Sequence, residues 1–432
     1  MEDLLAARAQ MAMSLAFHII FAVMGIGMPL LMVLAERQWL RTRQPVWLDL
    51  AKRWSKGTAI LFAVGAVSGT VLSFELGLLW PTFMEYAGPI IGMPFSLEGI
   101  AFFTEAIFLG VYLYGWTKLS ARAHWWAGVA VAVSGTVSGI FVVFANAWMN
   151  SPTGFTLVDG RPIALDPIAA MLNPAALPQA LHMTLAAFAT TGIAVAGIHA
   201  WMLRKDRTIL FHRAALTVAL WVAVPASLLQ IVSGDLSAKF VAKNQPVKLA
   251  ALEGHFQTER GAALRIGGIP NEKARETRYA IEIPNALSFL AFADFDAEVK
   301  GLEAFPESDW PPVAVVHVAF QIMVGLGTLM AIASLWVVVL WMRRRSPADS
   351  RPLLGYLTLL APAGFIAVEA GWVVTEVGRQ PWIIQGVMRT ADAVTPMPGL
   401  VVPFLVFTAL YIFLGIIVAW LLWAQVIRTR PA

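Results

Sequence analysis

The sequence of 432 residues contains no cysteine. Iron–sulfur clusters, thiolate-ligated heme, covalently attached c-type heme and blue copper all need cysteine ligands, so this chain cannot hold any of them by itself. A redox centre in this chain would have to use histidine, methionine or carboxylate side chains as ligands.

Charged residues are also scarce. They make up 13% of the chain and hydrophobic residues make up 58%, and the mean hydropathy is +0.70. Soluble domains of this length do not have such a composition. The sequence therefore predicts an integral membrane protein.

Long apolar runs recur along the whole chain, each near the roughly 20 residues that a helix needs to cross a bilayer. They predict an all-α polytopic fold with nine membrane-spanning helices. The first run is too long for a signal peptide and no small-residue cleavage site follows it, so we expect a retained helix. In an alternative arrangement, one run is re-entrant. The runs are 13–35, 57–80, 97–118, 125–149, 178–203, 214–234, 312–342, 353–375 and 400–427.

The Lys and Arg residues of the short connections are distributed unevenly between the two sides of the predicted bundle. Eighteen follow the odd-numbered runs and four lie on the opposite side. Because cytoplasmic loops are rich in Lys and Arg, we expect the N-terminus outside and the C-terminus in the cytoplasm. The same bias accounts for the net charge of +4, so no nucleic-acid partner is expected. The eighteen are Arg37, Arg41, Arg43, Lys52, Arg53, Lys56, Lys118, Arg122, Arg204, Lys205, Arg207, Arg213, Arg343, Arg344, Arg345, Arg351, Arg428 and Arg430, and the four are Arg8, Arg161, Arg379 and Arg389.

One connection is long, and it divides the chain into membrane helices at 1–234, an outer loop at 235–311 and further membrane helices at 312–432. Loops of this length in compact proteins are usually functional, so we expect a substrate to be handled here. The alternative is a solvated loop without a role. No internal repeat is evident, so an inverted-repeat transporter has no positive support.

Ionisable residues inside the apolar runs are costly and are therefore candidates for function. Histidine and methionine are the usual axial ligands of an electron-transferring heme, whereas a lone histidine or carboxylate leaves a position open for a gas. Taken singly, each candidate could equally be a hydrogen-bonded packing residue. Most lie near the predicted outer face. The candidates are His18, Glu75, Glu98, Glu105, His182, Met323, Glu369 and Glu376.

Glu98 and Glu105 are seven residues apart, which places both carboxylates on one side of the predicted helix. Such a pair suits a proton relay that steps inward. In the alternative interpretation, the two carboxylates only form hydrogen bonds with neighbouring hydroxyl groups or helix ends. Glu369 and Glu376 repeat the same spacing.

Several short sequence motifs resemble those of one known protein family. The segment Gly371–Trp382, GWVVTEVGRQPW, closely resembles the GW…E.GRQPW signature of subunit I of the cytochrome bd oxidases. The resemblance spans essentially the whole chain. It continues at Arg8-Ala9-Gln10 with His18, at Leu97-Glu98-Gly99 through Phe102-Phe103-Thr104-Glu105, at Ala145 to Met149, at Gln245 to Gly254, at Gly268-Ile269-Pro270 and at Ile322 to Gly325.

This resemblance implies three heme groups. It implies that His182 and Met323 ligate a low-spin heme b, and that His18 and Glu376 ligate two clustered high-spin hemes. Those two would be a high-spin heme b and a heme d, or a further heme b in place of heme d. Glu98 would lie beside them.

The resemblance also implies roles for polar residues around the hemes. Lys248 and Glu253 would interact with quinol, with Glu253 accepting a proton. Ser138 and Glu105 would line a proton path from the cytoplasm, and Arg379 would pair with heme propionates.

The activity implied is that of a terminal oxidase in the bacterial plasma membrane. Quinol, either ubiquinol or menaquinol, would be oxidised on the outer side and dioxygen reduced to water with cytoplasmic protons, which generates a membrane potential without pumping. A second membrane subunit, and optionally a small single-span subunit, would complete the complex. Alternatives are a quinol-oxidising cytochrome with another acceptor, or a heme-free secondary transporter.

Three departures from the family pattern stand out. Gln321 occupies a position where some members carry Arg, and loss of that charge would affect the low-spin heme. The outer loop lacks a long insertion, so the chain resembles the short-loop branch that includes the cyanide-insensitive oxidases. The spacing between Glu98 and Glu105 is one residue shorter than in long-loop members, which leaves both on one face.

Overall fold

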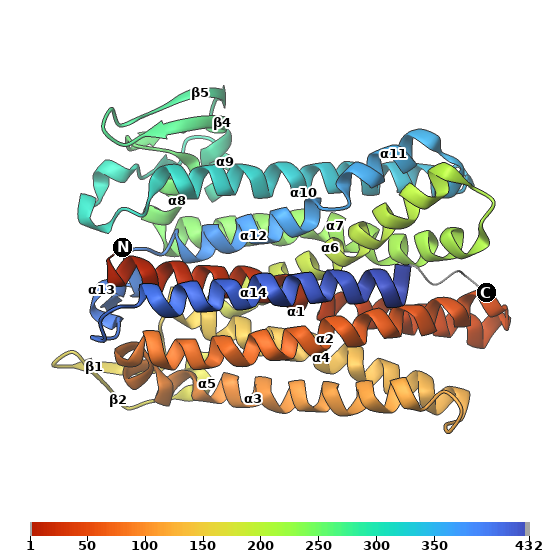
Figure 1. Ribbon diagram of the computed structural model, residues 1–432. Coiled ribbons are helices and arrows are strands. Elements are labelled where there is room, and N and C mark those ends of the chain that lie inside the picture. The colour runs from red at the N-terminus through yellow and green to blue at the C-terminus, as the bar shows by residue number, and fades with distance from the viewer. Residues whose placement is uncertain (1, 428–432) are drawn as a thin grey trace.

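The computed structural model describes residues 2–427. Within this range it contains nine helices that are long and apolar enough to cross a membrane, and they run side by side as one bundle (Figure 1). The predicted all-α membrane fold is therefore confirmed, whereas Arg428 and Arg430 of the charge count lie outside the described residues. The spans are α1 (Asp3–Thr42), α2 (Pro45–Leu79), α3 (Pro81–Tyr114), α4 (Ala121–Asn150), α6 (Ala176–Lys205), α7 (Leu210–Asn244), α10 (Val313–Met342), the pair α11 (Arg351–Leu360) and α12 (Ala363–Glu376), and α14 (Val401–Leu422).

The helices are longer than the apolar runs that predict them. The run at 13–35 lies inside α1, which has 40 residues and is therefore about 60 Å long, roughly twice the thickness of a bilayer core. Hydropathy detects only the part of a helix that lipid surrounds. The helix ends are set locally: Arg43 adopts a left-handed conformation after α1, and Pro45 begins α2, a position where its missing N–H costs nothing.

The eighth span is not the single helix that the run at 353–375 predicts. It is broken between Leu360 and Ala363 into α11 and α12. Pro362 lies in the break, and a proline cannot donate the backbone hydrogen bond that would continue a helix.

The main hydrophobic core lies where α1, α6, α7 and α11 meet, around the buried side chains of Leu31, Leu216 and Leu357. Helices α6 and α7 approach closely because Gly192 faces Ala223: a Cβ atom at Gly192 would lie 2.8 Å from the backbone nitrogen of Ala223. Small residues of this kind allow helices in membranes to pack at short range.

The last described helix, α14, runs beside α1 on the side of the bundle that faces the viewer in Figure 1. Its N-terminus is held by the first residues of the chain, because Asp3 Oδ1 accepts hydrogen bonds from the backbone nitrogens of Gly399 (3.1 Å) and Leu400 (2.9 Å). The rings of Phe17 on α1 and Tyr411 on α14 lie 4.6 Å apart between centroids. The first and the last described membrane helices thus lie side by side.

Small elements gather at the end of the bundle that carries the N-terminus (Figure 1). The long connection between α7 and α10 is folded there, with β4 and β5 forming an antiparallel hairpin. Because α7 continues to Asn244, the first ten residues of the loop predicted at 235–311 are helical. The elements are the hairpin β1 (Thr156–Val158) and β2 (Arg161–Ile163), α5 (Pro167–Met171), α8 (Pro246–Glu253), β3 (Glu259–Arg260), β4 (Leu264–Asn271), β5 (Glu276–Ile283), α9 (Ala286–Phe292), β6 (Glu298–Val299), the 3₁₀ turns Leu302–Ala304 and Glu307–Asp309, β7 (Trp382–Ile384), β8 (Met388–Arg389) and α13 (Thr390–Ala393).

Candidate functional site

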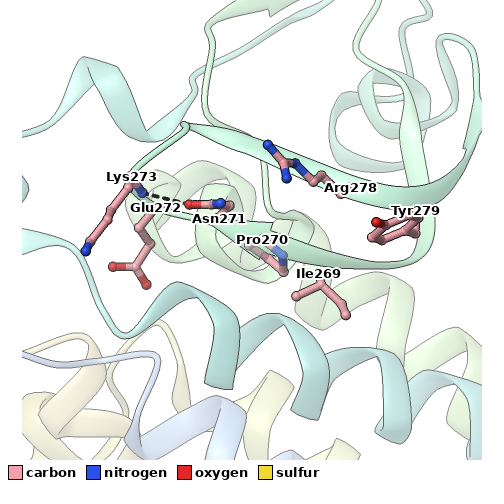
Figure 2. Close-up of a pocket in the computed structure, with 7 residues that line it drawn as sticks. All are labelled: Ile269, Pro270, Asn271, Glu272, Lys273, Arg278 and Tyr279. Atoms are coloured by element: carbon pink, nitrogen blue, oxygen red, sulfur yellow. Dashed lines mark hydrogen bonds between the residues drawn. The ribbon is translucent and has the colours of Figure 1, made fainter.

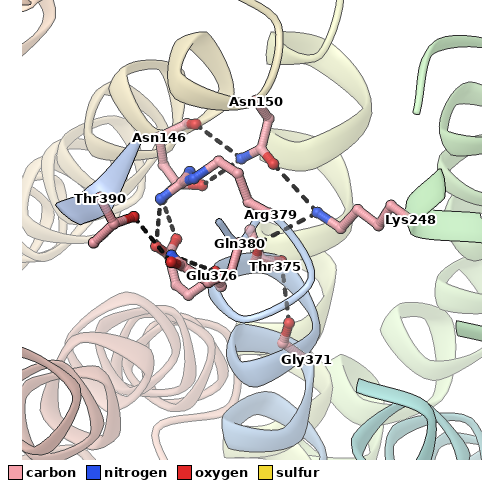
Figure 3. Close-up of polar contacts among 9 residues, drawn as sticks. All are labelled: Asn146, Asn150, Lys248, Gly371, Thr375, Glu376, Arg379, Gln380 and Thr390. Carbon is pink, nitrogen blue, oxygen red and sulfur yellow. Dashed lines mark hydrogen bonds and ion pairs between the residues drawn. The ribbon is translucent and has the colours of Figure 1, made fainter. Parts of the chain in front are cut away.

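A buried polar cluster surrounds Glu376 at the end of α12 (Figure 3). Arg379 Nη2 donates to Glu376 Oε2 at 2.6 Å, and Asn146 Nδ2 on α4 donates to Glu376 Oε1 at 2.5 Å. Arg379 is 3% exposed, and its Nε and Nη1 atoms have no hydrogen-bond partner among the described residues. A buried guanidinium with two unused donors fits an anionic group such as a carboxylate.

Lys248 belongs to the same cluster, although it comes from α8 in the outer loop (Figure 3). Its Nζ donates to Asn150 Oδ1 and to the carbonyl oxygen of Thr375, both at 3.2 Å. Burial lowers the pKa of Lys248 to about 7, Arg379 lowers it further, and Glu376 opposes both effects. The structure therefore joins a predicted quinol residue to a predicted heme ligand.

Glu253 is the last residue of α8 and is also buried. Within residues 2–427 its Oε2 atom has no hydrogen-bond partner. Burial raises the pKa of Glu253 to about 8, and the nearby positive charge of Arg265 partly offsets this rise. Such a carboxyl holds its proton at neutral pH but lies close to the value at which it releases one, which suits proton exchange with a substrate.

His18 packs against α2. Its Nδ1 lies 2.9 Å from Ser68 Oγ, and the Ser68 hydroxyl donates its own hydrogen to the carbonyl oxygen of Val64. When the hydroxyl donates to Val64, it accepts from His18, which places the imidazole hydrogen on Nδ1 and the lone pair on Nε2. A Cβ atom at Gly69 would lie 2.9 Å from His18 Cε1, so only glycine leaves room for this ring position.

His182 shows the same pattern on α6. Its Nδ1 lies 3.0 Å from Ser233 Oγ, whose hydroxyl donates to the carbonyl oxygen of Gln230. The amide of Gln230 lies 3.0 Å from His182 Nε2, where it can only donate if the hydrogen is on Nδ1. In this hydrogen-bond arrangement both histidines carry their hydrogen on Nδ1, which leaves Nε2 as the nitrogen suited to a metal.

Met323 lies on α10, which packs together with α6 against both α7 and α12. A Cβ atom at Gly371 on α12 would lie 3.1 Å from the Met323 sulfur. The absence of a side chain at Gly371 therefore makes the space in which the thioether lies. It lies in the same group of four helices as His182.

Glu98 and Glu105 lie on the face of α3 that packs against α4. Ser138 Oγ donates to Glu98 Oε1 at 3.4 Å. Glu105 lies against the backbone of α4, where a Cβ atom at Gly135 would be 2.9 Å from its carboxyl carbon. The two carboxylates share one helix face, as the spacing predicts.

The donor set fits heme. Two imidazoles, one thioether and one carboxylate are all axial ligands that heme iron accepts, although His182 Nε2 is hydrogen-bonded to the Gln230 amide here and would have to exchange that partner for iron. Arg379 adds two donors for propionates that are unpaired among residues 2–427, and Gly69 and Gly371 leave room for the His18 ring and the Met323 thioether.

Several polar residues of the site were not predicted as functional. Asn146 and Asn150 are four residues apart on α4 and therefore share a face, a signal that the sequence offers. His317 on α10 contacts the carbonyl oxygens of Leu252 (2.7 Å) and Gly267 (3.0 Å), so it ties the outer loop to the bundle.

Gln321, which stands where some family members carry Arg, joins the outer loop to α10. Its Oε1 accepts from the backbone nitrogen of Gly267 at 2.9 Å, and its Nε2 donates to the carbonyl oxygen of Arg265 at 3.0 Å. The amide therefore fixes β4 against α10.

Two cavities lie apart from these residues. A hollow of about 410 Å³ on the β4–β5 hairpin is lined by Ile269, Pro270, Asn271, Glu272, Lys273, Arg278 and Tyr279 (Figure 2). An apolar cavity of about 570 Å³ between α1, α10 and α12 includes Glu369, whose Oε1 has no partner in the described part of the chain. Glu369 is the one candidate residue from the sequence that lines either of these two cavities.

Comparison with known proteins gives a consistent result. The family model described as cytochrome bd terminal oxidase subunit I matches residues 6–431. The chain belongs to the cytochrome bd terminal oxidase subunit I family. It is 39% identical to a putative cytochrome bd menaquinol oxidase subunit I of Bacillus subtilis (strain 168), over 98% of this chain and 96% of that one.

Two further relatives agree. The cytochrome bd ubiquinol oxidase subunit 1 of the same organism is 33% identical, over 98% of this chain and 93% of the relative. The solved structure of the bd oxidase from Geobacillus thermodenitrificans has a TM-score of 0.93 and 39% identity, with 99% of each chain covered. The predicted family and fold are confirmed, and with them an oxidase that contains heme and works with a second subunit.

Proposed function

We propose that this chain is the quinol-oxidising subunit of a bd-type oxidase. Its relatives are named as menaquinol and ubiquinol oxidase subunits. The observation that carries the proposal is the position of Lys248, which links the outer loop directly to the Glu376 and Arg379 cluster. Substrate handled at the loop would thus be adjacent to the oxidase centre.

The ligand assignment follows the donor set. His182 and Met323 would hold a low-spin heme b, and His18 and Glu376 would hold two high-spin groups, a heme b and a heme d or a further heme b. When bound, these groups supply one-electron transfer and the reduction of dioxygen. The hydrogen bonds that His18 and His182 form with Ser68 and Ser233 support the assignment, because such partners orient imidazole ligands.

Glu253 would take the proton of a bound quinol. Its Oε2 is buried without a partner among residues 2–427, so a quinol hydroxyl would satisfy it. Lys248 lies on the same short helix. Because its pKa is lowered, it could donate a hydrogen bond to quinol either as a charged ammonium or as a neutral amine. The proton accepted by Glu253 would leave on the outer side.

Glu105, Glu98 and Ser138 would carry protons in the opposite direction, from the cytoplasm to the oxygen-reducing site. Their shared position between α3 and α4 supports this role. Protons released outside and protons consumed from inside together separate charge, so a membrane potential would form without a pump.

The orientation and organisation are part of the proposal. The N-terminus and the outer loop would lie outside the bacterial plasma membrane and the C-terminus in the cytoplasm, as the Lys and Arg distribution indicates. The helices of 1–234 and 312–432 would hold the hemes, and the loop of 235–311 would bind quinol. A second membrane subunit, and optionally a small single-span one, would complete the complex.

The test is a reduced-minus-oxidised absorption spectrum of the purified complex, combined with heme extraction and quinol-dependent oxygen consumption. A low-spin b band with oxygen consumption supports the proposal. An additional far-red band identifies heme d, and b bands alone identify the all-b form. A protein without heme, or a heme protein that oxidises quinol without consuming oxygen, overturns it.

A further inference from the structure

The face of α3 that carries Glu98 and Glu105 continues for two more turns to Tyr112. The three residues are each seven apart, so they lie in one row along the helix. The row points at α4, where Ser138, Gly135 and Gly128 face the three side chains in turn; a Cβ atom at Gly128 would lie 2.7 Å from the Tyr112 ring. The proton path therefore has a third polar side chain on its inner side.

Tyr112 is fully buried. Its hydroxyl group forms no well-aligned hydrogen bond in the described part of the chain, but the Glu36 carboxylate is close enough to interact with it by charge and as a hydrogen-bond acceptor. A tyrosine hydroxyl inside apolar packing normally finds a partner. One that lies beside a carboxylate without a well-aligned hydrogen bond is in a position to accept one proton and donate another.

Glu36 on α1 and His124 on α4 form a buried pair beside Tyr112, with Glu36 Oε1 2.8 Å from His124 Nδ1. The other ring nitrogen of His124, Nε2, lies 2.9 Å from the carbonyl oxygen of Tyr112. Both ring nitrogens therefore face acceptors. A neutral imidazole could satisfy both only if Glu36 carried a proton, so in either arrangement the pair holds one exchangeable proton.

The Glu36–His124 pair lies at the Tyr112 end of the row, which is the end nearer the predicted cytoplasmic side. Tyr112 is two residues from the end of α3, and His124 is three residues from the start of α4. The Trp116 ring covers His124 at 4.0 Å between centroids. The Glu36 Oε2 atom has no partner among residues 2–427. The pair lies beside the end that carries the excess of Lys and Arg, because Arg37 follows Glu36 directly and Arg122 is two residues before His124.

We propose that Glu36, His124 and Tyr112, which we call the entry cluster, load protons from the cytoplasm onto the path through Glu105 and Glu98. The inference rests on the proposed function, because it concerns the protons that oxygen reduction consumes.

The transfer balances without any redox step. Water gives a proton to the Glu36–His124 pair, whose earlier proton passes to the Tyr112 hydroxyl oxygen as that hydroxyl releases its own hydrogen toward Glu105. The net change is one proton moved from water to the Glu105 carboxylate. Seven residues of helix rise place Tyr112 and Glu105 about 10 Å apart along the axis, a gap that intervening water would bridge.

The competing explanation is structural. A buried carboxylate–histidine pair also ties α1, α3 and α4 together, and removing one partner would destabilise the protein. Tyr112→Phe separates the two explanations, because it removes only a hydroxyl group that forms no well-aligned hydrogen bond within residues 2–427. The helix contacts remain.

The experiment uses the complete oxidase. Tyr112→Phe and Glu36→Gln are compared with two matched variants at the same end of the bundle, Tyr356→Phe and His199→Gln. Tyr356 donates to the carbonyl oxygen of Leu329, and His199 pairs with His212 between α6 and α7. Neither lies on the α3 row.

The readouts are the heme spectrum and proton uptake, followed with a pH dye while the fully reduced enzyme reacts with oxygen. We expect unchanged spectra, uptake slowed at least tenfold in Tyr112→Phe, a larger solvent deuterium effect, and normal uptake in the two matched variants. Normal uptake in Tyr112→Phe overturns the inference even if Glu36→Gln fails to fold. A wild-type protein without heme or oxidase activity overturns the proposed function instead, so the two failures are distinguishable.

Discussion

Replacing Glu253 by Gln tests the outer loop, because the change removes a base and preserves the size of the side chain. With a pKa of about 8, about one Glu253 in ten is deprotonated at pH 7 and about one in a hundred at pH 6. If the deprotonated carboxylate accepts the proton of quinol, wild-type turnover rises about tenfold from pH 6 to pH 7 and levels off above pH 8. The variant should lose this pH dependence, and its turnover rate should fall by about 100-fold or more.

The assay is oxygen consumption with saturating quinol between pH 6 and pH 9, with heme spectra recorded on the same samples. Glu298→Gln is the matched control, because Glu298 is an exposed carboxylate of the same loop. We expect the control to follow the wild-type profile. A wild-type rate that does not change between pH 6 and pH 7, or a Glu253→Gln variant with full turnover, would show that Glu253 is not the base.

Two further substitutions test the heme ligands. Gly371→Ala places a methyl group 3.1 Å from the Met323 sulfur, so the low-spin b band should shift or weaken, whereas Gly325→Ala, with open space around it, should leave the spectrum unchanged. Arg379→Gln removes the charged partner of Glu376, and the loss of a buried pair costs about 3–5 kcal/mol. High-spin heme content measured by extraction should therefore fall while the low-spin signal persists; full heme content would contradict the assignment.

The fold could be predicted because its main determinant is local. An apolar run of sufficient length has few structures open to it inside a bilayer, so nine runs indicate nine helices. The ends of the helices could not be predicted in the same way. Asn244 ends α7 ten residues beyond the apolar run, in a polar segment that hydropathy assigns to the loop. The break at Pro362 was visible in the sequence, but proline is also tolerated inside membrane helices, as Pro29 in α1 shows.

The candidate site was predictable only where a motif or a spacing carried it. Residues of the family signature identify Glu376 and Arg379, and helical periodicity pairs Glu98 with Glu105. The contact of Lys248 with Thr375 depends on α8 folding back against α12, and no local pattern predicts a contact between residues 127 positions apart.

The entry cluster was missed for a different reason. Glu36 lies at the edge of its apolar run and resembles a charged residue at a membrane boundary. Only the packing of α1 against α4 shows that its side chain is completely buried and paired with His124.

The hydrogen bonds from Asp3 to Gly399 and Leu400 have a consequence for the order of biosynthesis. Among the described membrane helices, α1 is made first and α14, which packs beside it through Phe17 and Tyr411, is made last. The side of α1 that carries Phe17 therefore stays open to lipid until α14 has been synthesised. This contact can form only after all the other described membrane helices have been made, so it belongs to the late steps of assembly.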